Sequence, residues 1–123
     1  MTPEEAFLHA LRYGPLEETR EIVCKSSNYA YGYAREIDKC PREDTREAAC
    51  KNSIFAYHYA KDIDKCPRED TRKAVCKNPF YACYYMKYVD KGFHEDTWEA
   101  VKGTEYEEEY NKFLNQIEKE KII

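Results

Sequence analysis

Apolar side chains recur at helical spacing in three consecutive segments of the chain. Within each segment they stand three, four and seven positions apart, which places them on one face of an α-helix. The three stripes are Ala30, Tyr33, Ala34 and Ile37; Ala56, Tyr59, Ala60 and Ile63; and Ala82, Tyr85, Met86 and Val89. The pattern predicts a first helix, called helix A, over residues 27–38, 53–64 and 79–90.

Each helix A is expected to begin after a capping residue and to end at a polar joint. Ser26, Asn52 and Asn78 are residue types whose side chains accept from free backbone N–H groups. Pro79 suits the first helical position, where a missing N–H costs nothing. The stretch KCPRED then ends the helix, because the residue before a proline is disfavoured in helical backbone conformation.

A short second helix, called helix B, is expected after the joint. Its predicted N-caps are Asp44, Asp70 and Asp96. Glu47 and Glu99 stand three residues after two of these caps, as in a capping box. The arginines and glutamate of the joint are expected to form exposed ion pairs with the next repeat, each contributing about 0–1 kcal/mol. They are Arg42, Glu43 and Arg46 in the first unit.

This two-helix pattern is an internal repeat of 26 residues. Segments 24–49, 50–75 and 76–101 align without gaps, with 18 of 26 positions shared by the first pair and 13 of 26 by the second. A single helical pair cannot bury its apolar stripe alone, so neighbouring pairs must stack. The sequence therefore predicts one all-α domain over 1–123, an α-solenoid of about four helical pairs.

Both ends of the predicted solenoid carry capping segments. Residues 1–23 form an N-terminal cap or partial repeat, with Phe7, Leu8 and Leu11 expected to point inward. Residues 102–123 form a C-terminal capping helix from Thr104 onward. Its expected inward residues are Tyr106, Tyr110, Phe113, Leu114 and Ile117.

The nine residues DKCPREDTR occur twice, at 38–46 and at 64–72, which raises the question of a paired chemical site. The third copy, at 90–98, reads DKGFHEDTW and has lost both the cysteine and the proline. A shared chemical site would not survive that loss, whereas a joint between two helices can. We interpret the motif as a joint of the repeat.

The repeat resembles a known class of short helical repeats. A D-x-R-x-A-[AV] pattern, a turn and an aromatic–Ala–x–x–[YF]–[AM] helix are similar to αα repeats of about 25 residues in bacterial and bacteriophage proteins, a family of unknown function. The match covers 18–101 and lies in packing residues. The chain departs from the family in its KCPRED linker and its cysteines at 24, 40, 50, 66 and 76. The resemblance implies a solenoid and, with the compact acidic character, a phage-encoded inhibitor of a host defence protein.

Composition narrows the functional classes. The chain has 36% charged residues and a net charge of −4, which disfavours a general phosphate-binding role. Its first residues are acidic where a signal peptide is basic, and no run approaches the roughly 20 apolar residues of a membrane span. We therefore expect a cytoplasmic protein without membrane contact, with its six cysteines reduced.

A third functional hypothesis is a protein that works through cysteine or histidine chemistry. The cysteine spacings contain no C-x-x-C pair, and equivalent residues of stacked helices lie about 8–10 Å apart, beyond disulfide reach of about 7 Å. His9, His58 and His94 occupy three different repeat positions, and no phosphate loop, G-x-S-x-G or H-E-x-x-H occurs. We expect no enzyme, catalytic residue, metal or cofactor, with a Cys-based redox or metal protein as an alternative.

The positions that differ between repeats are the best functional candidates. On one flank of helix A they are Phe55 and His58 in the second repeat, and Tyr81, Tyr84 and Tyr88 in the third. Tyrosine is enriched at interface hot spots, so this flank predicts a site for a protein partner. The other interpretation is that the stripe receives the C-terminal helix through Tyr106 and Tyr110.

A single-stranded nucleic acid is the alternative partner. Arg35, Lys61 and Lys87 form a ladder with one basic residue per repeat, beside Tyr31 and Tyr57. Such a ladder can follow a phosphate backbone while tyrosines stack on bases. The aspartates of the joint are expected to run along the same side and to neutralise it. They are Asp38, Asp64 and Asp90.

Overall fold

The structure, a computed structural model, describes residues 1–122. These residues form helices and connecting turns without strands. In chain order the elements are α1 (Pro3–Tyr13), α2 (Glu17–Val23), α3 (Ser27–Tyr33), η1 (Ala34–Asp38), α4 (Glu43–Ala49), α5 (Ser53–Tyr59), η2 (Ala60–Asp64), α6 (Glu69–Val75), α7 (Pro79–Tyr85), η3 (Met86–Asp90), α8 (Glu95–Val101) and α9 (Glu107–Ile122). Among them, no helix has both the length and the apolar character of a membrane span.

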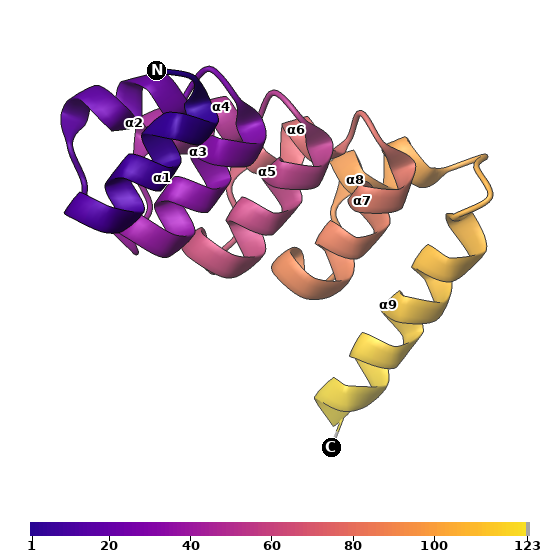
Figure 1. The fold of residues 1–123 in the computed structure, drawn as a ribbon. Helices are drawn as coiled ribbons and strands as arrows, with labels where there is room; N and C mark the ends of the chain where they lie inside the picture. The colour runs from indigo at the N-terminus through magenta and orange to yellow at the C-terminus, as the bar shows by residue number, and fades with distance from the viewer. Residues whose placement is uncertain (123) are drawn as a thin grey trace.

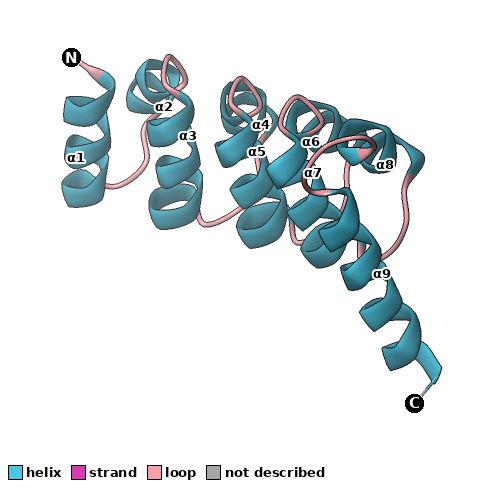
Figure 2. Ribbon diagram, turned by 90° about the vertical axis from the view of Figure 1, so that its right-hand side faces the viewer, coloured by secondary structure: helices cyan, strands magenta, loops and turns pink. Residues whose placement is uncertain are grey.

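The helices stack as successive pairs in two rows. The pairs are α1 with α2, α3 with α4, α5 with α6, and α7 with α8. Figure 2 shows α1, α3, α5 and α7 side by side in one row, the A row, and the even-numbered helices in a second, the B row. The two termini lie at opposite ends of the stack (Figure 1). The predicted all-α solenoid is confirmed.

The predicted start and end of helix A agree with the structure, with one difference in geometry. Asn52 and Asn78 accept from the backbone N–H groups two residues later, and Pro79 is the first helical residue. Ser26 occupies the N-cap position without a side-chain bond. The last five residues of each helix A, namely η1, η2 and η3, are π-helical rather than α-helical.

The predicted N-caps of helix B are wrong. α4 begins at Glu43 after the extended residue Arg42, so Asp44 is already the second helical residue. Its carboxylate instead accepts from the Arg42 guanidinium, with 3.2 Å from Nε to Oδ1. Asp70 behaves in the same way in α6, and α8 is capped by His94 Nδ1 rather than by Asp96. The predicted capping boxes with Glu47 and Glu99 are therefore absent from α4 and α8.

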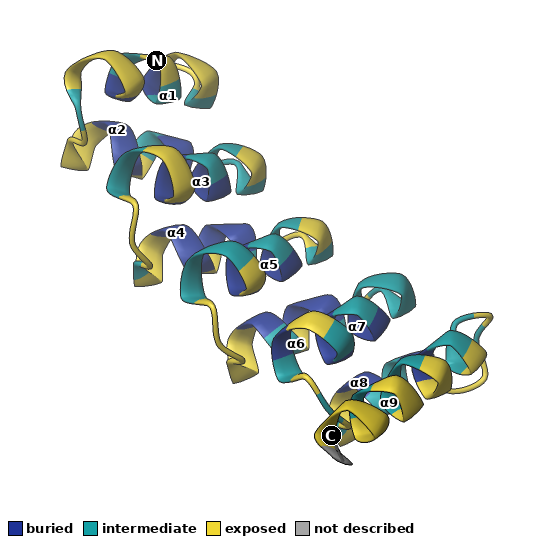
Figure 3. Cartoon of the chain, turned by 90° about the horizontal axis from the view of Figure 1, so that it is seen from below, coloured by how far each residue is buried: buried dark blue, intermediate teal, exposed yellow. Residues whose placement is uncertain are grey.

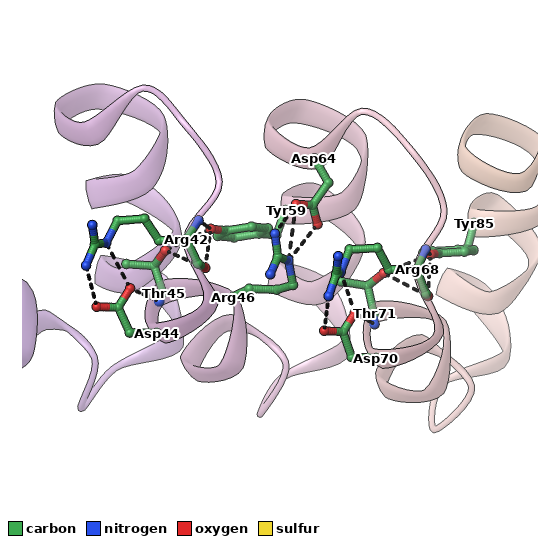
Figure 4. A network of polar contacts seen from close by, with 10 residues as sticks. All are labelled: Arg42, Asp44, Thr45, Arg46, Tyr59, Asp64, Arg68, Asp70, Thr71 and Tyr85. Carbon is green, nitrogen blue, oxygen red and sulfur yellow. Dashed lines mark hydrogen bonds and ion pairs between the residues drawn. The ribbon is translucent and has the colours of Figure 1, made fainter.

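A tyrosine from the next repeat completes the start of each helix B. The Tyr59 hydroxyl accepts from the Arg42 N–H at 2.9 Å and lies 2.8 Å from Thr45 Oγ1 (Figure 4). It also lies 3.0 Å from the Arg42 carbonyl oxygen, so one hydroxyl contacts three partners at the start of α4. The same joint recurs along the stack. The Tyr–Thr pairs are Tyr33–Thr19, Tyr59–Thr45, Tyr85–Thr71 and Tyr110–Thr97, with all four tyrosines at 0% exposure.

A buried ion pair covers each of the first three joints. The sequence predicted exposed pairs for Arg42 and Arg46, and the structure has an exposed pair at Arg42, with Asp44 of its own helix, but a buried one at Arg46. Arg46 Nη2 lies 2.6 Å from Asp64 Oδ1, with the two side chains 10% and 2% exposed. The same guanidinium lies over the Tyr59 ring, 5.5 Å from its centroid. This hydrogen bond to Asp64 holds the pKa of Arg46 above its ordinary value. The equivalent pairs are Arg20–Asp38 and Arg72–Asp90.

The π-helical turn accounts for this pairing. Asp64 follows Tyr59 by five residues, which in an α-helix would place the two side chains about 140° apart around the axis. A turn closed by i→i+5 hydrogen bonds brings residues five apart onto the same side. Lys65 then ends the turn in left-handed conformation, at φ 55°, with its N–H bonded to the Ala60 carbonyl. Arg46 can therefore cover the tyrosine ring and bind the aspartate at once.

The fourth joint keeps a side chain packed on the tyrosine ring but has no Arg–Asp ion pair. Trp98 stands 26 residues after Arg72 and packs on the Tyr110 ring, with 5.5 Å between centroids. Asn115 stands five residues after Tyr110, where the other repeats carry aspartate. α9 is a continuous α-helix without a π-helical turn. The turn therefore occurs in the repeats that form the ion pair.

The two end caps differ in how well the sequence predicted them. At the N-terminal end Ala6 and Ala10 are buried, whereas Leu8 and Leu11 are 54% and 51% exposed, so their inward placement is wrong. The two alanines set the helix register, which turns both leucines to the opposite side. At the C-terminal end α9 begins at Glu107 rather than at Thr104, and the predicted inward residues, with Tyr106 just before the helix, pack on Cys83, Met86 and Val101. Figure 3 shows the mostly exposed outer side of α9. Ile123, the last residue of the predicted cap, lies outside the described residues.

We expect Tyr59→Phe to lower the free energy of unfolding by about 1–3 kcal/mol, because it leaves the Arg42 N–H and the Thr45 hydroxyl without their buried partner. Urea unfolding monitored by circular dichroism measures the change. Tyr13→Phe is the matched control, because the Tyr13 side chain is exposed and makes no joint. A loss at Tyr59 no larger than in this control would contradict the role of the hydroxyl.

A second prediction concerns the buried ion pair. Asp64→Asn or Arg46→Trp alone should each lower the unfolding free energy by about 3 kcal/mol, since either leaves one buried charged or polar partner unpaired. The double variant copies the Trp98 and Asn115 arrangement and should recover at least half of the summed loss. Additive losses in a double-mutant cycle would show that the two residues do not act as a pair.

Candidate interaction surface

The side of the A row opposite its buried stripe carries the positions at which the repeats differ. We call it the front surface. Its residues are Leu8 and Leu11 on α1; Gly32, Arg35 and Glu36 on α3 and η1; His58, Lys61 and Asp62 on α5 and η2; and Tyr84, Lys87 and Tyr88 on α7 and η3. By contrast, the Tyr–Thr contact recurs in all four joints and the Arg–Asp pair in three of them. The front surface is therefore where one repeat is distinguished from the next.

Two of the predicted site residues belong to contacts between repeats. The Phe55 ring lies 5.9 Å from the Tyr31 ring, and the Tyr81 ring lies 5.7 Å from the Tyr57 ring, measured between centroids. Phe7 and Tyr29 make the same contact between α1 and α3, at 5.8 Å. These aromatic rings fill the space between neighbouring A helices. Phe55 and Tyr81 are therefore half-buried packing residues at the margin of the front surface.

The other three predicted residues lie on the front surface itself, in two groups. Tyr84 and Tyr88 stack nearly parallel, with centroids 5.9 Å apart and an interplanar angle of 9°. His58 lies one repeat away, 5.9 Å from the Tyr31 ring. Tyr57 contacts the His58 ring at 5.1 Å and the Tyr81 ring at 5.7 Å, and Phe80 contacts both Tyr81 and Tyr84, which connects the two groups. Tyr88 is the most exposed of the five predicted residues, at 44%.

The C-terminal helix covers part of the tyrosine stripe. Phe113 of α9 packs edge-on against Tyr84 at 5.6 Å, and Tyr106 packs against Phe80 at 5.6 Å. Tyr110 turns instead into the core beside Cys83 and Met86. The stripe therefore receives α9, as one interpretation of the sequence predicted, although through Phe113 rather than Tyr110. Tyr88 stays largely outside this contact.

Between α3 and η2 the front surface is a charged hydrogen-bond network. The Tyr31 hydroxyl donates to Asp62 at 2.6 Å and accepts from the Arg35 guanidinium at 3.1 Å. Burial, together with the Asp62 carboxylate, raises the pKa of Tyr31. His58 Nδ1 lies 3.9 Å from the same carboxylate, but burial lowers the pKa of this imidazole and favours its neutral form.

One repeat later, the equivalent place is aromatic. Tyr57 and Lys61 replace Tyr31 and Arg35, while Tyr88 stands where the earlier repeat has Asp62. Burial raises the pKa of Tyr57 to about 12, so its phenol stays neutral. The front surface thus changes from charged to aromatic along the stack. Sequence reasoning missed the linking role of Tyr31 and Tyr57, although their recurrence 26 residues apart marks them as a pair.

The expected neutralisation of the basic ladder is wrong. Asp38, Asp64 and Asp90 are half-buried residues whose side chains bind the arginines of the preceding helix B, away from the ladder. The carboxylates beside the ladder are instead Glu36, 2.8 Å from Arg35, and Asp62, 3.9 Å from Lys61. Lys87 lies over the Phe113 ring, with Nζ 3.8 Å from the centroid.

The cysteines divide into two environments, and all six are free thiols. Burial raises the pKa of the thiols of Cys24, Cys50 and Cys76 to about 11, and that of Cys83 to about 12. Cys40 and Cys66 are exposed at the joints between helices A and B. Across residues 1–122, no group of three histidine, cysteine or acidic side chains lies close enough to hold a metal ion.

Comparisons of the chain with protein-family models, with curated proteins and with solved structures find no match. The assignment of the front surface therefore rests on its residues and their geometry.

Thiol titration at about pH 8 should distinguish the two exposed cysteines from the four more buried ones. We expect Cys40 and Cys66 to react quickly with a disulfide reagent, and the other four at least about 100-fold more slowly, because a thiol with a pKa near 11 holds little thiolate at this pH. Replacing Cys40 and Cys66 by serine should remove the fast phase. A fast phase that persists in this variant would contradict the burial of the remaining thiols.

Proposed function

We propose that the chain is a non-enzymatic binding module that recognises a protein partner through the front surface of its A helices. The observation that carries the proposal is the separation of roles within each repeat. The tyrosine and threonine that build the joints recur in all four, while the exposed side of the A row differs from one repeat to the next. Repeat proteins place specificity in such varying positions on a shared scaffold.

The aromatic end of this surface suits a protein partner. Tyr88 is exposed, and its stacked neighbour Tyr84 is held in turn by Phe113 of α9. Lys87 lies within 5.0 Å of the Tyr88 ring centroid. A tyrosine that is already held in place loses little conformational entropy on binding, which is typical of an interface anchor.

Single-stranded nucleic acid is the second candidate, favoured by the ion pairs that remove Asp38, Asp64 and Asp90 from the basic ladder. Two observations weigh against it. Glu36 and Asp62 stand within the ladder, and the net charge of −4 repels a polyanion.

Affinity capture with the immobilised protein tests the proposal. The bacterial setting that the family resemblance implies makes nuclease-treated bacterial lysate the first source of partners. A captured partner, once purified, should bind the Tyr88→Ala variant at least about tenfold more weakly, because the variant removes a central aromatic contact. Circular dichroism should show an unchanged fold.

Tyr13→Ala supplies the matched control, since Tyr13 is an exposed tyrosine at the far end of the A row. Equal loss of binding in both variants would contradict a site at the aromatic end. A fluorescent single-stranded oligonucleotide bound more tightly than about 10 µM, with steep salt dependence, would favour the second candidate instead.

A further inference from the structure

A cleft of about 330 Å³ opens between the C-terminal ends of neighbouring A helices. Its lining residues come from η2, η3 and the joints that follow them. They are Ala60, Lys61, Lys65, Cys66, Pro67, Tyr88, Val89 and Lys91. Three of these side chains are cationic and none is a carboxylate, so we call it the lysine cleft. Its size lies in the range of small-molecule sites.

The equivalent cleft one repeat earlier has different electrostatics. It measures about 370 Å³ and contains Arg35, Lys39 and Lys65 in its lining, together with Asp62. Asp62 already accepts from Tyr31 and faces cations within that cleft. In the lysine cleft Tyr88 occupies the corresponding repeat position. A single exchange between the two repeats therefore removes the acid and supplies an aromatic ring.

The lysines of the lysine cleft have few carboxylate partners in the described part of the chain. Lys65 and Lys91 form no ion pair there, and the nearest carboxylate to Lys61 is Asp62, at 3.9 Å in the other cleft. The aspartates that precede Lys65 and Lys91 are bound to Arg46 and Arg72. Lys121 of α9 approaches Gly92 but pairs with Glu118 at 3.9 Å, so it adds no net charge near the joint.

We propose that the lysine cleft binds a mononucleotide. The ammonium groups of Lys61, Lys65 and Lys91 bind its phosphates, and the Tyr88 ring stacks on its base. Lysine is a point-charge phosphate ligand, and aromatic rings stack on any base. Val89 and Ala60 contribute apolar lining, as small-ligand sites require. The acidic chain repels a long polyanion, whereas a local group of cations still attracts a small one.

Isothermal titration of the full chain with three probes tests both halves of the proposal. ADP should bind with a dissociation constant below about 1 mM. Inorganic pyrophosphate, which lacks the ring, should bind several-fold more weakly, and adenosine, which lacks the phosphates, should show no saturation over the same range. Adenosine binding as tight as that of ADP would overturn the role of the lysines, and pyrophosphate binding as tight as that of ADP would overturn the role of Tyr88.

A matched pair of variants locates the site. Lys91→Gln should weaken ADP binding at least about fivefold, because Lys91 lines only the lysine cleft. Lys39→Gln, at the same repeat position and the same φ of 55°, lines only the other cleft and should leave the affinity within about twofold. Equal effects of the two variants would overturn the assignment to this cleft.

Alkylation provides a second readout within one molecule. Cys66 lines the lysine cleft and Cys40 lines the other. Saturating ADP should slow iodoacetamide modification of Cys66, followed by mass spectrometry, and leave Cys40 unchanged. Equal protection of both thiols, or of neither, would overturn the proposal. Binding of a protein partner is measured without nucleotide, in a separate assay. Absence of ADP binding would therefore contradict the nucleotide cleft and leave the proposed protein-binding surface untouched.

Discussion

The tyrosine hydroxyl buried at each joint is the interaction on which the solenoid depends. A helix B of seven residues leaves free N–H groups at its start, and the KCPRED joint supplies no side-chain cap in α4 or α6. Tyr59 supplies the missing partner from the following repeat, at 2.9 Å from the Arg42 nitrogen. One repeat therefore completes the helix start of the one before it, which couples neighbouring repeats during folding and unfolding.

The same tyrosine ring supports the charged part of the joint. Arg46 lies over the Tyr59 ring and binds Asp64, and the π-helical turn brings Asp64 to that side of the helix. The last joint shows that the ring contact can form without the ion pair and the π-helical turn. With Trp98 in place of arginine, the ring contact remains, while the ion pair and the turn are both absent.

Because the joints lie between the two rows, the front of the A row is free to vary. The exchange of Asp62 for Tyr88 illustrates the effect. Asp62 accepts from Tyr31 and lies near Lys61, whereas Tyr88 is an exposed ring in the cleft of Lys65 and Lys91, which form no ion pair within residues 1–122. The proposed protein-binding surface and the proposed nucleotide cleft both arise from this change, on a scaffold that the joints hold constant.

The sequence by itself determined the repeat, the helix A stripe and the C-terminal cap, because apolar spacing such as Ala56, Tyr59 and Ala60 reflects burial directly. The sequence identified the tyrosines of the candidate site but could not tell which are packed and which are exposed. Tyr81 packs against Tyr57 of the preceding repeat, whereas Tyr88 is exposed. Only the tertiary structure decided the capping by Tyr59, the burial of Arg46 with Asp64, the π-helical turn and the acid-free cleft. Each of these depends on contacts between residues of different helices, which no local pattern specifies.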